Sequence, residues 1–208
     1  MTTTDDSRPT KDRLIDAAIG LFAHNGVAAT TVGDIERAAG MAPRSGALYK
    51  YFESKGSLLE AGLERHLAAI SDVGDDLALR PLGDLRSELT MLARWTMAEL
   101  DRERTILHVI EREGVSLGEL RNRMRTGVSD RGYQVGASIL ARWLPDLTVV
   151  ERESLAVVTI GSLVNYKRST WTFGAAPLGL TEDEFISAWV DLLYAQAGEQ
   201  PCVLPGAR

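Results

Sequence analysis

Residues 30–52 read TTVGDIERAAGMAPRSGALYKYF and predict two short helices separated by a turn. Thr31 can cap the first helix, with Asp34 at the reciprocal position of a capping box, and Gly40 suits its end. Three apolar residues have the spacing of core positions: Ile35, Leu48 and Phe52. A helix-turn-helix of this kind places its second helix in the major groove of DNA, and we expect that helix to begin near Pro43.

Helical spacing continues along the rest of the chain, and the sustained alternation typical of strands is absent from the sequence. Glycine and proline fall mostly between the helical stretches. The expected helices cover residues 10–24, 31–40, 43–51, 54–70, 84–100, 104–113, 117–144, 148–173 and 181–197. The sequence therefore predicts an all-α fold.

Composition sets further limits on the class of protein. The chain has 208 residues, of which 45% are hydrophobic and 25% charged, which suffices for a sizeable globular core. A formal net charge of -6 argues against a protein that coats nucleic acid nonspecifically, although a local basic face remains compatible with it. The single cysteine, Cys202, excludes an intrachain disulfide. The sequence has neither a signal peptide nor a membrane-spanning apolar run, so we expect a cytoplasmic protein without a membrane partner.

Several spaced elements together resemble a known family. They are Thr30-Thr31-Val32-x-Asp34-Ile35, Ala39-Gly40, Gly46-Ala47-Leu48-Tyr49-Lys50-Tyr51-Phe52, Ser54-Lys55 and Leu58-Leu59. This ordered set is similar to the DNA-binding domain of the tetracycline-repressor (TetR) family, and the match covers roughly a quarter of the chain. The resemblance implies a three-helix DNA-binding domain followed by a larger helical domain for ligand binding and dimerisation. The expected limits are a flexible arm 1–9, the DNA-binding domain 10–56, a linking helix 57–73, the larger domain 74–198 and a tail 199–208.

The second helix of the motif and its neighbours supply the candidate DNA contacts. We expect Arg44 to recognise a base, because a guanidinium can form paired hydrogen bonds with guanine. Hydroxyl and ammonium groups nearby suit phosphates, and the resemblance implies phosphate contacts for Tyr49 and Lys55. The full set of candidates is Thr31, Arg44, Ser45, Ala47, Tyr49, Lys50 and Lys55.

One departure from the family pattern falls where base recognition would begin. The usual pattern runs from the glycine to the tyrosine in seven steps, whereas Gly40 to Tyr49 takes nine. The two extra residues lie within 41–45. They either lengthen the turn or add most of a helical turn to the front of the second helix, as proline at a first helical position would favour.

The resemblance implies an effector cavity and a dimer interface in the larger domain. Large or amphipathic side chains that could line a cavity are Met91, Trp95, His108, Met124, Tyr133 and Trp171. Candidates for a dimer interface on the last two helices are Leu155, Val158, Leu163, Tyr166, Phe185, Trp189 and Leu192. The same helical spacing also fits an intrachain core for every one of these residues.

Enzyme motifs do not fit their context. Residues 114–118, GVSLG, match the nucleophile pattern of some hydrolases, but that pattern needs a preceding buried strand, and the residues before it indicate an amphipathic helix. The three histidines lack the spacing of metal ligands. We therefore expect no enzyme activity, metal or cofactor.

These observations predict a homodimeric transcription regulator that binds double-stranded operator DNA with pseudo-palindromic symmetry. The prediction includes repression that is relieved by a small-molecule effector of unknown identity. The alternative is a helical small-molecule-binding protein or enzyme without specific DNA binding.

Overall fold

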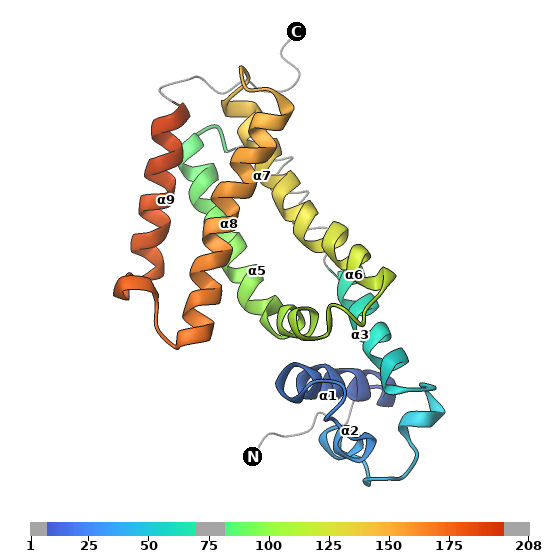
Figure 1. Cartoon of the computed structure of the whole chain (residues 1–208). Coiled ribbons are helices and arrows are strands. Elements are labelled where there is room, and N and C mark those ends of the chain that lie inside the picture. Colours follow the sequence, from blue (N-terminus) through green and yellow to red (C-terminus); the bar gives the residue numbers. More distant parts are fainter. Residues whose placement is uncertain (1–7, 70–81, 198–208) are drawn as a thin grey trace. The chain divides into compact units, whose positions relative to one another are not determined.

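A computed structural model describes residues 8–69 and 82–197, and no β-strand occurs in these two ranges. The elements in chain order are α1 (Thr10–Asn25), α2 (Val32–Ala38), η1 (Leu48–Lys50), α3 (Lys55–Ala69), α5 (Leu85–Glu113), α6 (Glu119–Met124), η2 (Arg125–Asp130), α7 (Arg131–Trp143), α8 (Val149–Phe173), η3 (Pro177–Gly179) and α9 (Glu182–Ala197) (Figure 1). The all-α prediction is confirmed.

Contacts divide the described residues into two units. The first contains residues 8–69 and 103–127, and the second contains residues 82–102 and 128–197. Helix α5 contributes its N-terminal part to the second unit and its C-terminal part to the first. The domain limits expected from the sequence stay a prediction, and most of the expected terminal segments lies outside the described residues.

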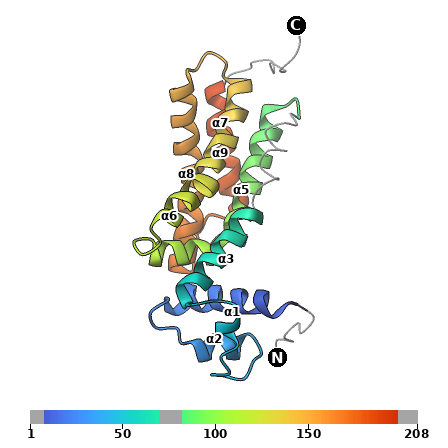
Figure 2. The same cartoon turned by 90° about the vertical axis from the view of Figure 1, so that its right-hand side faces the viewer.

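The first unit is built around α1, which packs against α2 and α3 (Figure 2). Its apolar side chains recur at helical spacing, and several are fully buried: Leu14, Phe22, Ile35, Leu48, Leu58 and Leu63. Burial of each such side chain contributes about 1.5–3 kcal/mol. A Cβ atom at Gly62 would lie only 2.7 Å from Ile19 Cδ1, so the glycine permits the close approach of α3 to α1.

Two helix boundaries differ from those expected. Helix α5 continues through residues 101–103, where we predicted a break, because that stretch contains no glycine or proline to end it. The helix predicted over 117–144 is instead divided by the π-helical turn η2 between α6 and α7. Gly127 lies in this turn, and a Cβ atom there would lie 2.8 Å from Leu67 Cδ2. The π-helical turn therefore lies where Gly127 packs closely against Leu67.

The second unit has one core to which α5, α7, α8 and α9 all contribute, for example through Leu92, Trp143, Leu163 and Trp189. Its buried carboxylate, Glu88, accepts hydrogen bonds from Arg142 at 2.7 Å and from Trp143 Nε1 at 3.0 Å. These bonds offset the cost of placing the charge among apolar side chains. None of the described helices is long and apolar enough to cross a membrane.

Candidate nucleic-acid interface

The start of α2 is stabilised by the capping box that the sequence predicts. The Thr31 hydroxyl accepts a hydrogen bond from the Asp34 N–H at 3.2 Å, and the Asp34 carboxylate accepts one from the Thr31 N–H at 3.3 Å. Hydrogen bonding from the Thr31 side chain, followed by that from Arg37, lowers the pKa of Asp34. Thr31 is an exposed residue whose hydroxyl caps the start of α2.

The two extra residues lengthen the turn between the helices. Residues 41–47 form no helix, and the second helix of the motif is reduced to η1, a single 3-10 turn. The turn includes two residues with positive φ, Arg44 at 61° and Gly46 at 74°. Glycine adopts this conformation easily, whereas arginine does so at a cost. The helix expected from residue 43 is therefore wrong, because the backbone turns left-handed at residue 44.

A buried carboxylate to which we assigned no role holds this turn. Glu36 on α2 has no exposed surface, and its two carboxylate oxygens accept hydrogen bonds from the Ser45 N–H at 3.0 Å and the Leu48 N–H at 3.2 Å. Burial alone would raise the pKa of Glu36, but these backbone hydrogen bonds outweigh it and lower the pKa. The only sequence signal for this role was an acidic residue next to the core position Ile35, which is too common to be diagnostic.

Ser45 and Ala47 take part in the same turn. The Ser45 hydroxyl accepts a hydrogen bond from the Ala47 N–H at 3.3 Å, and the Ser45 N–H donates to Glu36. Both residues therefore shape the turn, in addition to any contact with DNA that the sequence predicts for them.

The exposed cations of this surface are Arg44 and Lys50. Within residues 8–69 they are the two lysine or arginine side chains that form no hydrogen bond, ion pair or ring contact. Beside them, Tyr49 is 61% exposed although it lies next to the fully buried Leu48. A free guanidinium, a free ammonium and an exposed phenol thus lie within seven consecutive residues. Such groups bind phosphates and base edges.

The ammonium group of Lys55 is directed toward the protein backbone. It donates hydrogen bonds to the carbonyl oxygens of Val27 and Thr30, each at 2.7 Å, from the first residue of α3. The Val27 N–H in turn donates to the Glu113 carboxylate at 2.9 Å. Lys55 therefore has a structural role in holding the α1–α2 loop, besides the phosphate contact that the family resemblance implies.

The residues predicted to line an effector cavity are divided between the two units. Met91 and Trp95 lie along a hollow of about 670 Å³ on α5, together with Arg94, Ala98 and others. Tyr133 and Trp171 belong to the same unit but do not line this hollow, and His108 and Met124 belong to the other unit. No group of three or more histidine, cysteine, aspartate or glutamate side chains suited to a metal ion occurs among the described residues.

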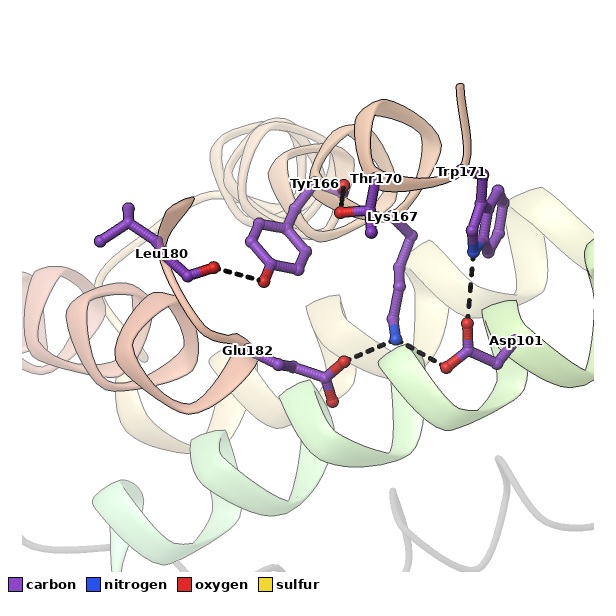
Figure 3. A network of polar contacts seen from close by, with 7 residues as sticks. All are labelled: Asp101, Tyr166, Lys167, Thr170, Trp171, Leu180 and Glu182. Carbon is purple, nitrogen blue, oxygen red and sulfur yellow. Dashed lines mark hydrogen bonds and ion pairs between the residues drawn. The ribbon is translucent and has the colours of Figure 1, made fainter. Parts of the chain in front are cut away.

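A polar network within the second unit joins α8 to α5 and to the start of α9 (Figure 3). Buried Lys167 donates to Asp101 at 2.6 Å and to Glu182 at 2.5 Å. Burial would lower the pKa of Lys167, but the hydrogen bonds to these two carboxylates raise it. The Tyr166 hydroxyl donates to the Leu180 carbonyl at 2.9 Å. These bonds fix the geometry of the hairpin formed by α8 and α9.

Residues predicted for the dimer interface fall on opposite sides of this hairpin. Leu163, Tyr166 and Trp189 are buried in the core of the chain itself, so a second chain would not meet them at the surface. Leu155 and Phe185 are half-buried against that core. Val158 of α8 and Leu192 of α9 are exposed by 70% and 61%, and Val150 and Val157 of α8 are also exposed. Residues of α5 and α7 pack with Leu163, Tyr166 and Trp189 in that core.

Comparisons with known proteins agree with this arrangement. The family model described as bacterial regulatory proteins, tetR family, matches residues 14–61. ArpR of Pseudomonas putida, a probable HTH-type transcriptional regulator, is 29% identical over 201 residues that cover 91% of each chain. AcrR of Shigella flexneri, an HTH-type transcriptional regulator, is 28% identical over 57% of this chain and 55% of its own.

Solved structures show the same fold over nearly the whole chain. A putative TetR-family regulator from Mesorhizobium loti has a TM-score of 0.68 at 18% identity, covering 94% of this chain and 98% of its own. FadR of Bacillus subtilis, solved in complex with stearoyl-CoA, has a TM-score of 0.59 at 18% identity over 88% and 96%. The family match includes the whole helix-turn-helix. The similarity to ArpR also covers most of the helices that follow it. The helix-turn-helix domain of this chain, residues 14–61, belongs to the tetR family of bacterial regulatory proteins.

Proposed function

We propose that this protein binds double-stranded operator DNA as a homodimer and represses transcription until a small-molecule effector releases it. The observation that carries the proposal is the pair of exposed cations, Arg44 and Lys50, which have no partner among the described residues and lie near the exposed Tyr49 in the sequence of the helix-turn-helix. Although the protein has a net charge of -6, these two exposed cations are six residues apart in the helix-turn-helix, where they can bind a polyanion. Operator DNA would place its site of action in the cytoplasm.

Apolar side chains on α8 and α9 support the homodimer. Val150, Val157, Val158 and Leu192 are between 48% and 71% exposed, and the polar network around Lys167 holds the hairpin that carries them. Covering these side chains with the same surface of a second copy removes them from water. A two-fold dimer also presents two helix-turn-helix motifs to DNA at a separation of about one helical turn, ~34–36 Å, or a multiple of it.

We propose that the effector binds in the second unit. The FadR structure holds stearoyl-CoA, which shows that one relative of this fold accepts a small molecule. The hollow beside Met91 and Trp95 has a volume of about 670 Å³ and is the candidate site in this chain. Cavities of about 300–1,000 Å³ are typical of small-molecule sites. An effector weakens operator binding to the extent that it prefers a dimer state in which the two motifs are wrongly spaced.

Selection of bound DNA from a random duplex pool tests the proposed function. We expect enrichment of a pseudo-palindrome whose two halves are related by two-fold symmetry, with binding that weakens as salt rises. Failure to enrich any sequence, together with salt-independent binding, would contradict the assignment. A single half-site without a symmetric partner would contradict the dimer.

Substitution of Lys50 tests the phosphate contacts separately. Lys50→Met should make the logarithmic salt dependence of operator binding shallower by about 0.9 for each subunit, because each ammonium neutralises one phosphate. Its effect on thermal stability should be small, because the ammonium is exposed and has no partner among the described residues. Gel-shift titrations at several salt concentrations measure the slope. Lys50→Arg keeps the charge and should leave the slope unchanged. If Lys50→Met has the same slope as the parent protein, Lys50 does not contact a phosphate.

A further inference from the structure

We propose that Glu36 is a positioning residue for base recognition, which acts by holding the lengthened turn so that Arg44 meets one base of the operator. The proposal rests on the proposed function and adds to it a residue that does not itself touch DNA. It also means that recognition starts from a turn, since residues 41–47 form no helix and η1 spans only Leu48–Lys50.

The Glu36 carboxylate binds the backbone on both sides of Gly46, at Ser45 and at Leu48. One carboxylate oxygen receives the Ser45 N–H at 3.0 Å, and the other receives the Leu48 N–H at 3.2 Å, at the start of η1. The backbone carbonyl of Glu36 accepts the Met41 N–H at 2.8 Å, so the same residue also holds the beginning of the turn. A single residue of α2 thus determines the path of the chain on both sides of Arg44.

The buried carboxylate of Glu36 is stabilised by backbone amides of the turn. Glu36 has no exposed surface, and the groups that donate to it at Ser45 and Leu48 are neutral backbone amides rather than a lysine or arginine. An unpaired buried charge is unfavourable unless hydrogen bonds replace the lost water. The backbone amides of the turn supply those bonds, so the turn and the buried charge stabilise each other.

The aliphatic part of the Arg44 side chain packs against α2, whereas the residue as a whole is exposed. Its φ of 61° lies in the left-handed region, which a non-glycine residue adopts only where the surrounding structure imposes it. A Cβ atom at Gly33 of α2 would lie 3.6 Å from Arg44 Cγ, so the stem packs closely beside that helix. The guanidinium is exposed and has no partner among the described residues. This arrangement preorganises the side chain and leaves its donors available for a base.

Glu36 is expected to act through Arg44 because its carboxylate is buried and cannot reach DNA. Loosening the turn should therefore release Arg44 from its left-handed conformation and weaken the preference for one base pair. It should leave the phosphate contacts largely intact, since these depend on charge more than on exact orientation.

The test compares four proteins by selection from a random duplex pool: the parent, Glu36→Gln, Arg44→Ala and the double variant. Glu36→Gln keeps the size of the side chain, but its amide cannot accept both backbone N–H groups. We expect the preference for one base pair in each half-site to fall about tenfold in each single variant, and at the same position in both. The double variant should lose little more than Arg44→Ala alone, because the two residues act as a unit. Salt dependence should match between the parent and Glu36→Gln.

Thermal unfolding followed by circular dichroism accompanies every binding measurement. If Glu36→Gln does not stay folded, Glu36→Asp keeps the charge, shortens its reach and should show the same loss at the same base pair. Discrimination that stays at the parent level, or a loss that adds fully to that of Arg44→Ala, would overturn the proposal for Glu36. A parent protein that enriches no sequence would instead contradict the proposed function, so the two failures are distinguishable.

Discussion

Val158→Glu should convert the proposed dimer into a monomer and lower operator affinity by about a hundredfold or more, because each buried unpaired charge costs several kcal/mol and 1.4 kcal/mol is about tenfold. The side chain is 70% exposed on α8, so the substitution leaves the intrachain core untouched. In a two-fold interface the two glutamates would lose water together and near each other. A monomer binds only one half-site, which is the origin of the large drop in affinity.

Sedimentation equilibrium measures the oligomeric state, and gel shifts measure operator affinity. Val115→Glu is the matched control, because Val115 is 95% exposed between α5 and α6 and lies outside the proposed interface. It should remain dimeric and bind normally. Leu192→Glu, on α9, should repeat the effect of Val158→Glu. A dimer that survives both substitutions with parental affinity would rule out this face of α8 and α9.

Lys55→Met should lower the free energy of unfolding by about 2–4 kcal/mol, since a hydrogen bond to a charged group contributes about 1.5–3 kcal/mol. The ammonium donates to the carbonyls of Val27 and Thr30, both at 2.7 Å, and methionine replaces its stem without its donors. The two carbonyls then lose their partner at the end of the α1–α2 loop. Denaturant unfolding followed by circular dichroism measures the change.

Binding measurements separate this structural role from a phosphate contact. If Lys55 mainly holds the loop, folded Lys55→Met at low temperature should retain the salt dependence of the parent. If it mainly binds phosphate, stability should change little while the slope falls by about 0.9 for each phosphate that is no longer neutralised. Lys50→Met is the matched control, with the same chemical change at an unpartnered lysine. Parental stability in Lys55→Met would contradict the role assigned here to its hydrogen bonds.

Local signals were enough to predict the ends of α1, α3, α8 and α9 to within one residue. The capping box of Thr31 and Asp34 forms as expected, and Gly40 has a φ of 76° just after α2. A second capping box, formed by Thr148 and Glu151, starts α8 where the sequence places it. Such interactions join residues three or four apart, so the chain specifies them without help from distant segments.

Contacts between distant segments account for the features that periodicity did not predict. The turn depends on Glu36, which lies nine residues before Ser45 and twelve before Leu48. The hydrogen bonds of Lys55 reach back twenty-eight residues to Val27. Neither partner can be inferred from periodicity, because periodicity reports which residues share a helix face and not what that face meets.

The sequence alone determined the all-α fold, the position of the helix-turn-helix and the presence of Arg44, Tyr49 and Lys50 on it, since these follow from capping, spacing and residue type. Tertiary structure was needed to establish that the two extra residues form a turn and that Lys55 holds a loop. It also separated the exposed Val158 and Leu192 from the buried Leu163, Tyr166 and Trp189. Periodicity assigns both groups to apolar positions of α8 and α9, and only the packing of α5 and α7 shows which side remains uncovered.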